Sequence, residues 1–406
     1  MKAFLPVRLL SLGGAVAAAF LIMTAAKGMN SFVQLLILTA ALYVILAVSL
    51  NLVNGITGQF SLGHAAFYMV GAYSSGFLTI HHYNHSFGPV GWTLLMIAVG
   101  AILAALAGLL VGLPSLRLRG DYLAIVTLGF GEIMRIIVQN TKPLGEAYGM
   151  SVKPEHLPQG MTTSPLLTNM QLIVVAWLLA FATIGICRNI LQHVQGLAFL
   201  SIREDEVAAN AMGVNTTKVK VTAFVLAAAL AGGAGAILAP FTGFVTPAHF
   251  DMNVSVLILT MVVLGGTGSI TGSVIAALTL FLLPEKMRDL KQIGMPTILG
   301  IMFAVFAVVY ALRWIIANVH TGRQQRTIYS LAAVAGGFVL AFIFAKLTGM
   351  IPAVAAKVVD PSPLRFVLNA FTLIILMLLR PQGLFGHHEL SLSKLFGNES
   401  PTGAVK

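Results

Sequence analysis

Long apolar stretches separated by short polar segments recur along nearly the whole chain. About 20 helical residues cross a hydrocarbon core of about 30 Å. By this criterion the pattern predicts spans at 9–26, 32–53, 60–80, 90–112, 120–139, 168–187 and 219–246, and further spans at 295–317, 328–348 and 366–380. We therefore expect an all-α polytopic membrane protein with about 9 to 11 transmembrane or re-entrant helices.

Two parts of this pattern need separate interpretation. The first apolar run follows Lys2 and Arg8 as in a signal peptide, but its length and the span soon after it favour an uncleaved first helix. Residues 253–283 are apolar but interrupted by the glycine-rich run 265–269. Because glycine favours turns over helix interiors, we expect two short helices joined by a turn.

Composition supports the membrane assignment and excludes several other classes. Hydrophobic residues make up 58% of the chain and charged residues only 9%, against roughly 25% in a soluble domain. The single cysteine, Cys187, rules out a disulfide within the chain and a Cys-cluster metal site, which argues against a redox role. A histidine metal site has little support either, because His81, His82 and His85 fall in an expected external turn without carboxylate or cysteine partners.

The excess of Lys and Arg over Asp and Glu, 24 to 13, sets orientation in a polytopic protein rather than indicating nucleic-acid binding. With the amino terminus in the cytoplasm, the loops on that side collect more of the basic residues. This orientation requires 253–283 to dip into the membrane and return. It places the loop 188–218 and the carboxyl terminus in the cytoplasm.

A charged island at 201–215 stands out from its apolar surroundings. Ser201 and Glu204 have the spacing of a capping box, so we expect a helix to begin there with acidic residues 204–206 in its first turn. Gly213 suits a left-handed helix end, and Asn215 suits the cap of the next helix. That next helix carries Lys218 and Lys220 at the membrane surface. The small residues of the island would let another protein approach closely; the alternative is a solvated connection between two spans.

Five segments together carry a resemblance to a known family. Residues 202–214 resemble the cytoplasmic loop of bacterial ABC importer permeases, specifically the branched-chain amino-acid permease family of the LivM type. Residues 54–73, 120–135, 261–269 and 379–385 are similar to other segments of that family and occur in the same order. The five segments together are specific for the family, although no single segment is specific.

The resemblance implies that the island is a coupling helix, which inserts into a groove on a separate ATP-hydrolysing subunit. This role falls on Ser201, Arg203, Glu204, Asp205, Glu206, Ala208, Ala209 and Gly213. The sequence has no G-x-x-x-x-G-K-[ST] phosphate-binding loop, which fits hydrolysis by another polypeptide. The chain would then be a translocation subunit rather than an enzyme, with no cofactor of its own. Its partners would be a second permease subunit, two ATP-binding subunits and a periplasmic or external solute-binding protein, in the bacterial inner membrane.

Polar and glycine residues inside the spans are where we expect the translocation pathway, because burying a charge in lipid costs several kcal/mol. For Glu132 and Arg135 the alternatives are a mutual ion pair, or a role in gating or in contact with a delivering binding protein. For His64 they are helix packing or hydrogen bonding, or substrate contact. The glycines either permit close helix packing or mark broken helices that line a cavity. The predicted pathway set is Gly58, Ser61, Gly63, His64, Thr127, Glu132, Arg135, Gly265, Gly266 and Gly268.

The chain departs from the family after residue 283. We expect a permease core at 1–283, an insertion with two extra spans at 284–365, the final helix at 366–386 and a cytoplasmic tail at 387–406. An even number of added crossings leaves the final helix in its original direction. The external loop 141–168 also differs from the glycine-rich stretch that the family often has there.

These features favour import of branched-chain or other apolar amino acids. The same machinery carrying urea or short amides is the near alternative. An ion-coupled secondary transporter is an alternative of another class, but it usually needs charges near the bilayer midplane, where only Glu132 and Arg135 are available. An intramembrane hydrolase lacks support, because neither a G-x-S-x-G nor an H-E-x-x-H pattern occurs.

Overall fold

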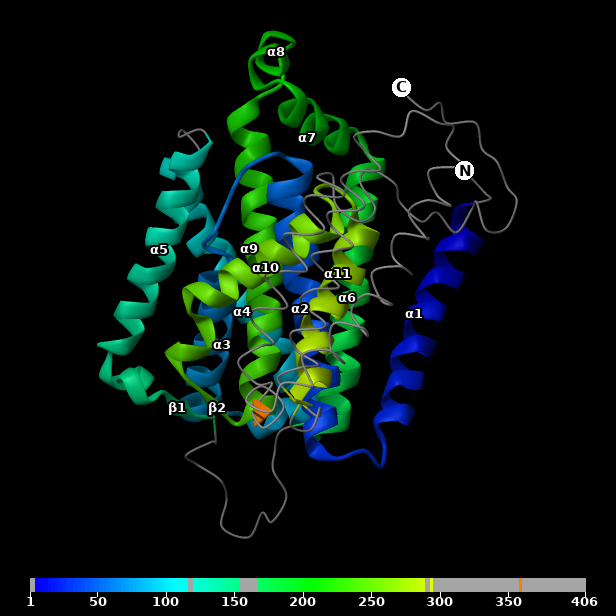
Figure 1. Ribbon diagram of the computed structural model, residues 1–406, viewed down its shortest axis with the longest axis vertical. Coiled ribbons are helices and arrows are strands. Elements are labelled where there is room, and N and C mark those ends of the chain that lie inside the picture. The colour runs from blue at the N-terminus through cyan, green and yellow to red at the C-terminus, as the bar shows by residue number, and fades with distance from the viewer. Residues whose placement is uncertain (1–3, 116–119, 153–166, 289–292, 295–357, 360–406) are drawn as a thin grey trace. The chain divides into compact units, whose positions relative to one another are not determined.

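The computed structural model describes residues 4–115, 120–152, 167–288, 293–294 and 358–359. Nearly all of these residues are helical (Figure 1). The long helices are α1 (Phe4–Ala26), α2 (Ser31–Asn51), α3 (His64–His82), α4 (Gly88–Ser115), α5 (Asp121–Gln139), α6 (Asn169–Gln192), α9 (Thr216–Thr242), α10 (Met252–Gly265) and α11 (Ile270–Arg288). The shorter ones are η1 (Leu52–Ile56), η2 (His85–Phe87), η3 (Lys142–Leu144), η4 (Glu146–Tyr148), α7 (Val194–Glu204), α8 (Glu206–Ala211) and η5 (Pro247–Phe250).

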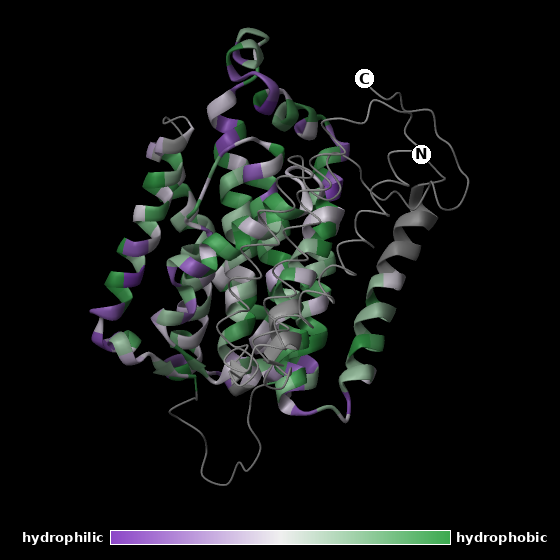
Figure 2. Cartoon of the chain, viewed as in Figure 1, coloured by the Kyte–Doolittle hydropathy of each residue, from purple (hydrophilic) through white to green (hydrophobic). Residues whose placement is uncertain are grey.

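Six described segments are long and apolar enough to cross a membrane: Ser31–Ile56, Gly88–Pro114, Tyr122–Gln139, Asn169–Gln192, Thr216–Thr242 and Pro247–Gly265. Figure 2 shows mostly hydrophobic colouring along the central helices, with hydrophilic residues near the α7–α8 end and along α5. The all-α polytopic fold is confirmed. The predicted spans at 295–317, 328–348 and 366–380 lie outside the described residues, as do the segment 379–385 and the tail 387–406.

The centre of the described bundle is α9, which packs against α3 and α4. Glycines make this packing close: a methyl group on Gly71 of α3 would collide with the carbonyl of Gly232 of α9. A methyl group on Gly235 would likewise meet the backbone of Tyr68. The packing interpretation of the glycines is therefore confirmed for Gly71, because small residues let helix backbones approach each other in membranes.

A two-stranded antiparallel pair closes the end of the bundle away from α7 and α8 (Figure 1). It joins β1 (Met150–Ser151) to β2 (Phe244–Val245), with Met150 opposite Val245. The Val152 N–H also donates to the Gly243 carbonyl at 2.9 Å. These bonds tie the loop after α5 to the end of α9.

Residues 279–383 form a second compact unit. Its described part consists of the end of α11 and the antiparallel strands β3 (Ile293–Gly294) and β4 (Val358–Val359). The rest of the predicted insertion 284–365 lies outside the described residues.

Candidate functional site

The chain between α2 and α3 does not continue as one helix. After Asn51 it forms the π-helical turn η1, and residues 57–63 are not helical before α3 starts at His64. The Asn54 side chain stabilises this break, because its Nδ2 donates to the Ser61 carbonyl and its Oδ1 accepts from the Ser61 N–H, each at 3.2 Å. The helix of the predicted span 60–80 therefore begins a few residues later, at His64.

The glycine-rich run after α10 forms a second break. Gly266 and Gly268 have φ angles of 107° and 96°, which L side chains rarely adopt. Ser269 then accepts from the Gly272 N–H at 3.1 Å through its Oγ at the start of α11. The predicted turn between two helices is confirmed. The backbones of Gly265 and Gly272 lie too close for a methyl group on either.

The two breaks lie against each other. The Gly268 N–H donates to Asn51 Oδ1 at 2.9 Å. A methyl group on Gly55 would collide with Gly268 N and with Asn51 Oδ1. Interrupted helices with adjacent free backbone groups are the arrangement from which membrane transporters build polar sites.

Neighbouring helices supply the hydrogen-bond partners for the start of α3. The Ala65 N–H donates to Ser255 Oγ of α10 at 3.2 Å, and the Leu62 N–H donates to Thr127 Oγ1 of α5 at 3.0 Å. A methyl group on Gly63 would collide with the Thr127 carbonyl. The predicted residues Gly63 and Thr127 are thus brought together, in a packing contact rather than in an open channel.

His64 is buried and its Nε2 lies 2.8 Å from Ser49 Oγ. The hydrogen-bonding interpretation of His64 is therefore confirmed. Because this bond joins α2 to the first residue of α3, it spans the break on the side facing the core.

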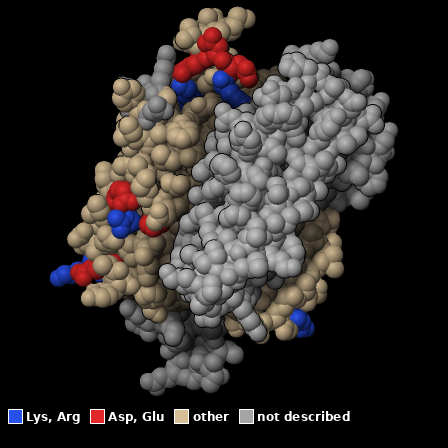
Figure 3. All heavy atoms as spheres, viewed as in Figure 1, with Lys and Arg blue, Asp and Glu red and all other residues tan. Residues whose placement is uncertain are grey.

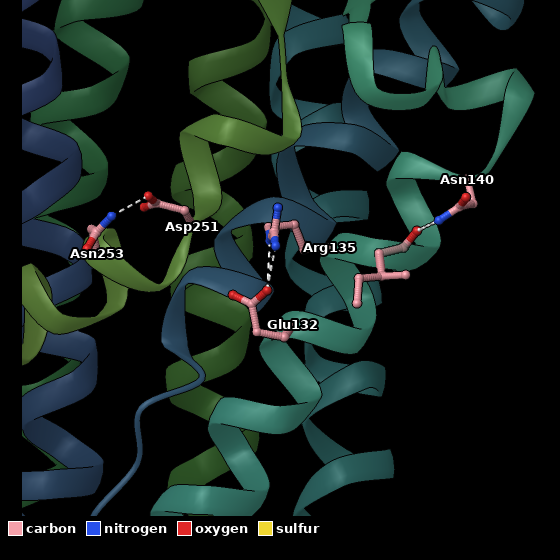
Figure 4. Close-up of polar contacts among 6 residues, drawn as sticks. Glu132, Arg135, Asn140, Asp251 and Asn253 are labelled. Carbon is pink, nitrogen blue, oxygen red and sulfur yellow. Dashed lines mark hydrogen bonds and ion pairs between the residues drawn. The ribbon is translucent and has the colours of Figure 1, made fainter.

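Glu132 and Arg135 form an ion pair within α5, with Arg135 Nη2 and Glu132 Oε2 2.7 Å apart (Figure 4). This confirms the pairing interpretation. Asp251, also drawn there, caps α10 by accepting from the Val254 N–H at 3.1 Å and accepts from Asn253 Nδ2 at 2.7 Å. Glu132 and Asp251 line a hollow of about 10 Å³, which has room for about one water molecule.

The coupling loop, residues 188–218, differs from the prediction at its centre. Ser201 does not start a helix; it lies inside α7, where its Oγ donates to the Ala198 carbonyl at 3.0 Å. The residue that caps α8 is Asp205, whose Oδ1 accepts from the N–H groups of Val207 and Ala208 at 2.8 and 3.1 Å. The capping-box spacing was misleading because Asp205, in an extended conformation, supplies the cap one turn later. Glu204 consequently ends α7, and of the acidic residues only Glu206 lies in the first turn of α8.

The other end of the loop is as predicted. Gly213 has a φ of 86°, and Asn215 Oδ1 caps α9 by accepting from the Lys218 N–H at 2.9 Å. Lys220 was expected at the membrane surface, but its side chain is only 8% exposed and its Nζ lies 2.6 Å from Glu206 Oε1. This ion pair fixes α8 to α9.

The inner face of the coupling loop contacts both breaks. Phe199 of α7 packs in a buried cluster with Leu52 and Ile56 of η1. A methyl group on Gly58 would lie 3.4 Å from Arg203 Cα, and one on Gly268 would press on the Arg203 guanidinium. Arg203 therefore lies against both glycine-rich segments.

The outer face of the loop is exposed and partly apolar. Val207 and Met212 are 64% and 84% exposed. Ala208 is also exposed, whereas Ala209, which we expected on the same approachable surface, is buried because it faces the bundle. Figure 3 shows acidic and basic atoms gathered at this end of the molecule, around α7 and α8. Exposed apolar side chains rimmed by charges are typical of a protein-binding surface.

Sequence reasoning missed several residues of the site. Four of these residues are buried: Asn51, Gln59, Ser255 and Lys220. Asn51, Ser255 and Lys220 also bond to another segment. Asn51 and Lys220 carried a signal, because each is a polar side chain next to or within an apolar run. Ser255 carried none, since serine is common in membrane helices and only the fold brings it to α3. Among the described residues, no group of three or more His, Cys, Asp or Glu side chains is placed to hold a metal ion.

The chain is similar to transport permease components of known sequence. The family described as "Branched-chain amino acid transport system / permease component" matches residues 31–312. The high-affinity branched-chain amino acid transport system permease protein LivM of Escherichia coli K12 is 39% identical over 282 residues, which is 64% of this chain and 65% of LivM. LivH of the same organism is 30% identical over 248 residues, or 59% of this chain and 79% of LivH.

A more distant relative is the probable branched-chain amino acid transport permease protein LivM of Methanocaldococcus jannaschii, 26% identical over 313 residues, which is 69% of this chain and 88% of that protein. The chain spans about 65% of the length of the bacterial LivM proteins that it matches. No solved structure matches the chain.

Proposed function

Because the chain belongs to the family of branched-chain amino acid transport permease components, we propose that it is the translocation subunit of an ATP-driven importer for branched-chain or other apolar amino acids. The family match over residues 31–312 carries this proposal, since it includes both helix breaks and the coupling loop. The six apolar segments support a multi-pass location, and we place the chain in a bacterial inner membrane. The coupling loop and both termini then face the cytoplasm.

The proposed assembly needs other subunits. Relatives of both the LivM and LivH kinds match this chain, which supports pairing with a second permease subunit. Two ATP-binding subunits supply hydrolysis, because this sequence contains no phosphate-binding loop. An external solute-binding protein delivers the amino acid. In this arrangement ATP is used by the partners and this chain binds no cofactor.

The coupling loop is the proposed docking surface for an ATP-binding subunit. Val207 and Met212 project from it and are available for contact. Its inner side carries the Glu206–Lys220 ion pair to α9 and the Arg203 contacts to Gly58 and Gly268. A displacement of α7 and α8 would therefore be passed to the two breaks, where glycine gives the backbone more conformational freedom than a continuous helix has.

The two breaks are the proposed narrow part of the pathway. A zwitterionic amino acid needs polar groups for its ammonium and carboxylate beside apolar walls for its side chain. Segment 52–63 and the turn 266–269 bring non-helical backbone into apolar surroundings, and the Asn51–Gly268 hydrogen bond holds the two segments together. Glu132 and Arg135 lie further along α5, where they are available to a delivering protein or to a gating movement.

Reconstitution tests the proposal. The protein is incorporated into proteoliposomes with its second permease subunit, the ATP-binding subunits and the binding protein, and uptake of labelled leucine is measured with and without ATP. We expect uptake only with ATP and the binding protein present. Uptake driven by an ion gradient without the ATP-binding subunits would contradict the importer assignment. Labelled urea and acetamide in parallel decide the cargo: uptake of these and not of leucine would assign the amide alternative.

A narrower test concerns the coupling surface. Glu206→Lys and Gly213→Pro should weaken co-purification of the ATP-binding subunits, because the first replaces an ion pair by repulsion and the second forbids the left-handed turn. Membrane insertion should stay intact. Unchanged co-purification and transport in both variants would count against the docking role.

A further inference from the structure

A hollow of about 110 Å³ lies between the coupling loop, the first break and the start of α5. Its walls include Gln59 and Phe60 of the break, Leu123 of α5, Ile202 of α7, Glu206 of α8 and Lys220 of α9. Since about 10–15 Å³ of such space is enough to hold one water molecule, the hollow has room for a small molecule.

The polar wall of the hollow carries one charge of each sign. Glu206 Oε1 and Lys220 Nζ lie 2.6 Å apart, and the Lys220 side chain is only 8% exposed. A lone anion would be attracted by Lys220 and repelled by Glu206, and a lone cation would meet the reverse. The wall therefore selects for a ligand that carries both charges.

Gln59 adds a hydrogen-bond acceptor to this wall. Its side chain is 4% exposed, and its Nε2 donates to Thr57 Oγ1 at 3.1 Å. Its Oε1 is buried and has no hydrogen-bond partner among the described residues. Leaving a buried acceptor unsatisfied costs about 1–3 kcal/mol, so an ammonium donor at this position would be favoured.

We propose that this hollow binds a small zwitterion with an aliphatic side chain, of the α-amino-acid class. The ammonium and carboxylate of such a ligand lie about 3 Å apart by covalent geometry, close to the spacing of the protein's own pair. The ammonium then contacts Glu206 and Gln59, the carboxylate contacts Lys220, and the aliphatic group lies against Phe60, Leu123 and Ile202.

The position of the hollow gives the site a regulatory consequence. It touches α8 and α9 on one side and the first break on the other, so a bound ligand holds the coupling loop against the segment that it must move. Free amino acid on the coupling-loop side should therefore slow ATP-driven uptake. This consequence rests on the proposed function, whereas the binding itself does not.

The binding test uses the complete transporter complex in lipid nanodiscs, without the solute-binding protein, and isothermal titration with leucine. Two analogues serve as chemical controls: N-acetyl-leucine lacks the ammonium and isopentylamine lacks the carboxylate. We expect leucine to bind, and both analogues to bind about tenfold more weakly or not at all, since each loses a charge-assisted contact.

Variants locate the site. Gln59→Leu and the neutral double variant Glu206→Gln/Lys220→Met should weaken leucine binding about tenfold or more. Lys218→Met is the matched control, because Lys218 is exposed and lies two residues away on the same helix, and it should bind as the wild type does. Size-exclusion profiles and retained ATP-binding subunits show that each variant is folded. Leucine binding that is absent, or unchanged in both site variants, would overturn the proposal.

The regulatory consequence is measured in proteoliposomes by loading leucine on the coupling-loop side and following uptake from the other side. Uptake is expressed relative to each protein's own uptake without loading. This ratio should fall with loading in the wild type and in Lys218→Met, and stay unchanged in Gln59→Leu. ATP-driven uptake with no leucine binding in nanodiscs would reject this site and leave the proposed function standing. Leucine binding without ATP-driven uptake would support this site and contradict the proposed function.

Discussion

The Asn51 side chain accepts a hydrogen bond of 2.9 Å from the Gly268 N–H, although 217 residues separate the two in the chain. This bond joins the end of α2 to the turn between α10 and α11. It holds together two places where a membrane helix is interrupted, next to the Arg203 side chain of the coupling loop. In the proposed importer it therefore lies between the surface that receives the ATP-driven movement and the segments that respond to it.

Asn51→Leu tests the importance of that bond. The substitution leaves the Gly268 N–H without this acceptor, which should lower the free energy of unfolding by about 1–3 kcal/mol. Thermal unfolding of the detergent-solubilised protein measures the change. Asn140→Leu is the control, because the Asn140 side chain bonds to the Ile136 carbonyl of the adjoining helix α5 and is exposed. Equal shifts in the two variants would show that the Asn51 bond adds nothing.

Gly71→Ala tests the close packing of α3 on α9. Its methyl group would collide with the Gly232 carbonyl, so we expect about 1–3 kcal/mol of destabilisation from overpacking. Gly185→Ala in α6 adds the same methyl group where nothing lies within 4 Å, and it should be neutral or stabilising by up to about 1 kcal/mol. Thermal unfolding midpoints compare the two. If Gly71→Ala left the unfolding midpoint unchanged, α3 and α9 would be able to move apart without a loss of stability.

Lys220→Met tests the ion pair between α8 and α9. Removing the ammonium takes this counter-charge from the Glu206 carboxylate, and since Glu206 is 27% exposed we expect a loss of about 1–3 kcal/mol, below the range for a fully buried pair. The double variant Glu206→Gln/Lys220→Met should recover most of that loss because it removes both charges together. Limited proteolysis of the loop 188–218 reports the effect locally. A double variant less stable than Lys220→Met would contradict this account.

Two residues have been assigned as the helix cap of the coupling loop: Asp205 by the structure and Ser201 by sequence spacing. Substitutions at the two positions distinguish these assignments. Asp205→Ala should cost about 1 kcal/mol of helix stability and reduce co-purification of the ATP-binding subunits, whereas Asp205→Asn keeps an acceptor and should be close to wild type. Ser201→Ala should have little effect, since Ser201 Oγ bonds within α7. A large effect of Ser201→Ala together with a silent Asp205→Ala would restore the capping-box interpretation.

Arg203→Ala tests transmission from the loop to the breaks. The variant removes the side chain that lies between Gly58 and Gly268, so ATP-binding subunits should still associate while transport per ATP hydrolysed falls. Arg203→Lys keeps the charge but not the planar guanidinium, and it should give an intermediate value. The ratio of leucine uptake to phosphate release in proteoliposomes measures coupling. An unchanged ratio in Arg203→Ala would exclude this route.

Sequence patterns predicted correctly several interactions between residues that are close in the chain. The left-handed Gly213, the Asn215 cap and the i, i+3 pair of Glu132 and Arg135 each depend on residues within a few positions, and the structure has all three. The cap of α8 failed although it is also local. Two residues one turn apart, Ser201 and Asp205, offered equally acceptable caps, and spacing alone did not distinguish them.

The sequence by itself determined the class of protein, because repeated apolar runs of about 20 residues cross a hydrocarbon core as helices, which satisfy their own backbone groups. It also determined the family through the order of five segments. It also marked the glycine-rich segments, since glycine is expected wherever backbones turn sharply or approach closely. Only the tertiary structure decided what those glycines contact: Gly268 meets Asn51, and Gly63 meets Thr127. It also decided that Lys220 is buried against Glu206. The physical reason is that these contacts join different helices and turns, so their geometry is set by how whole helices pack and not by the local order of residues.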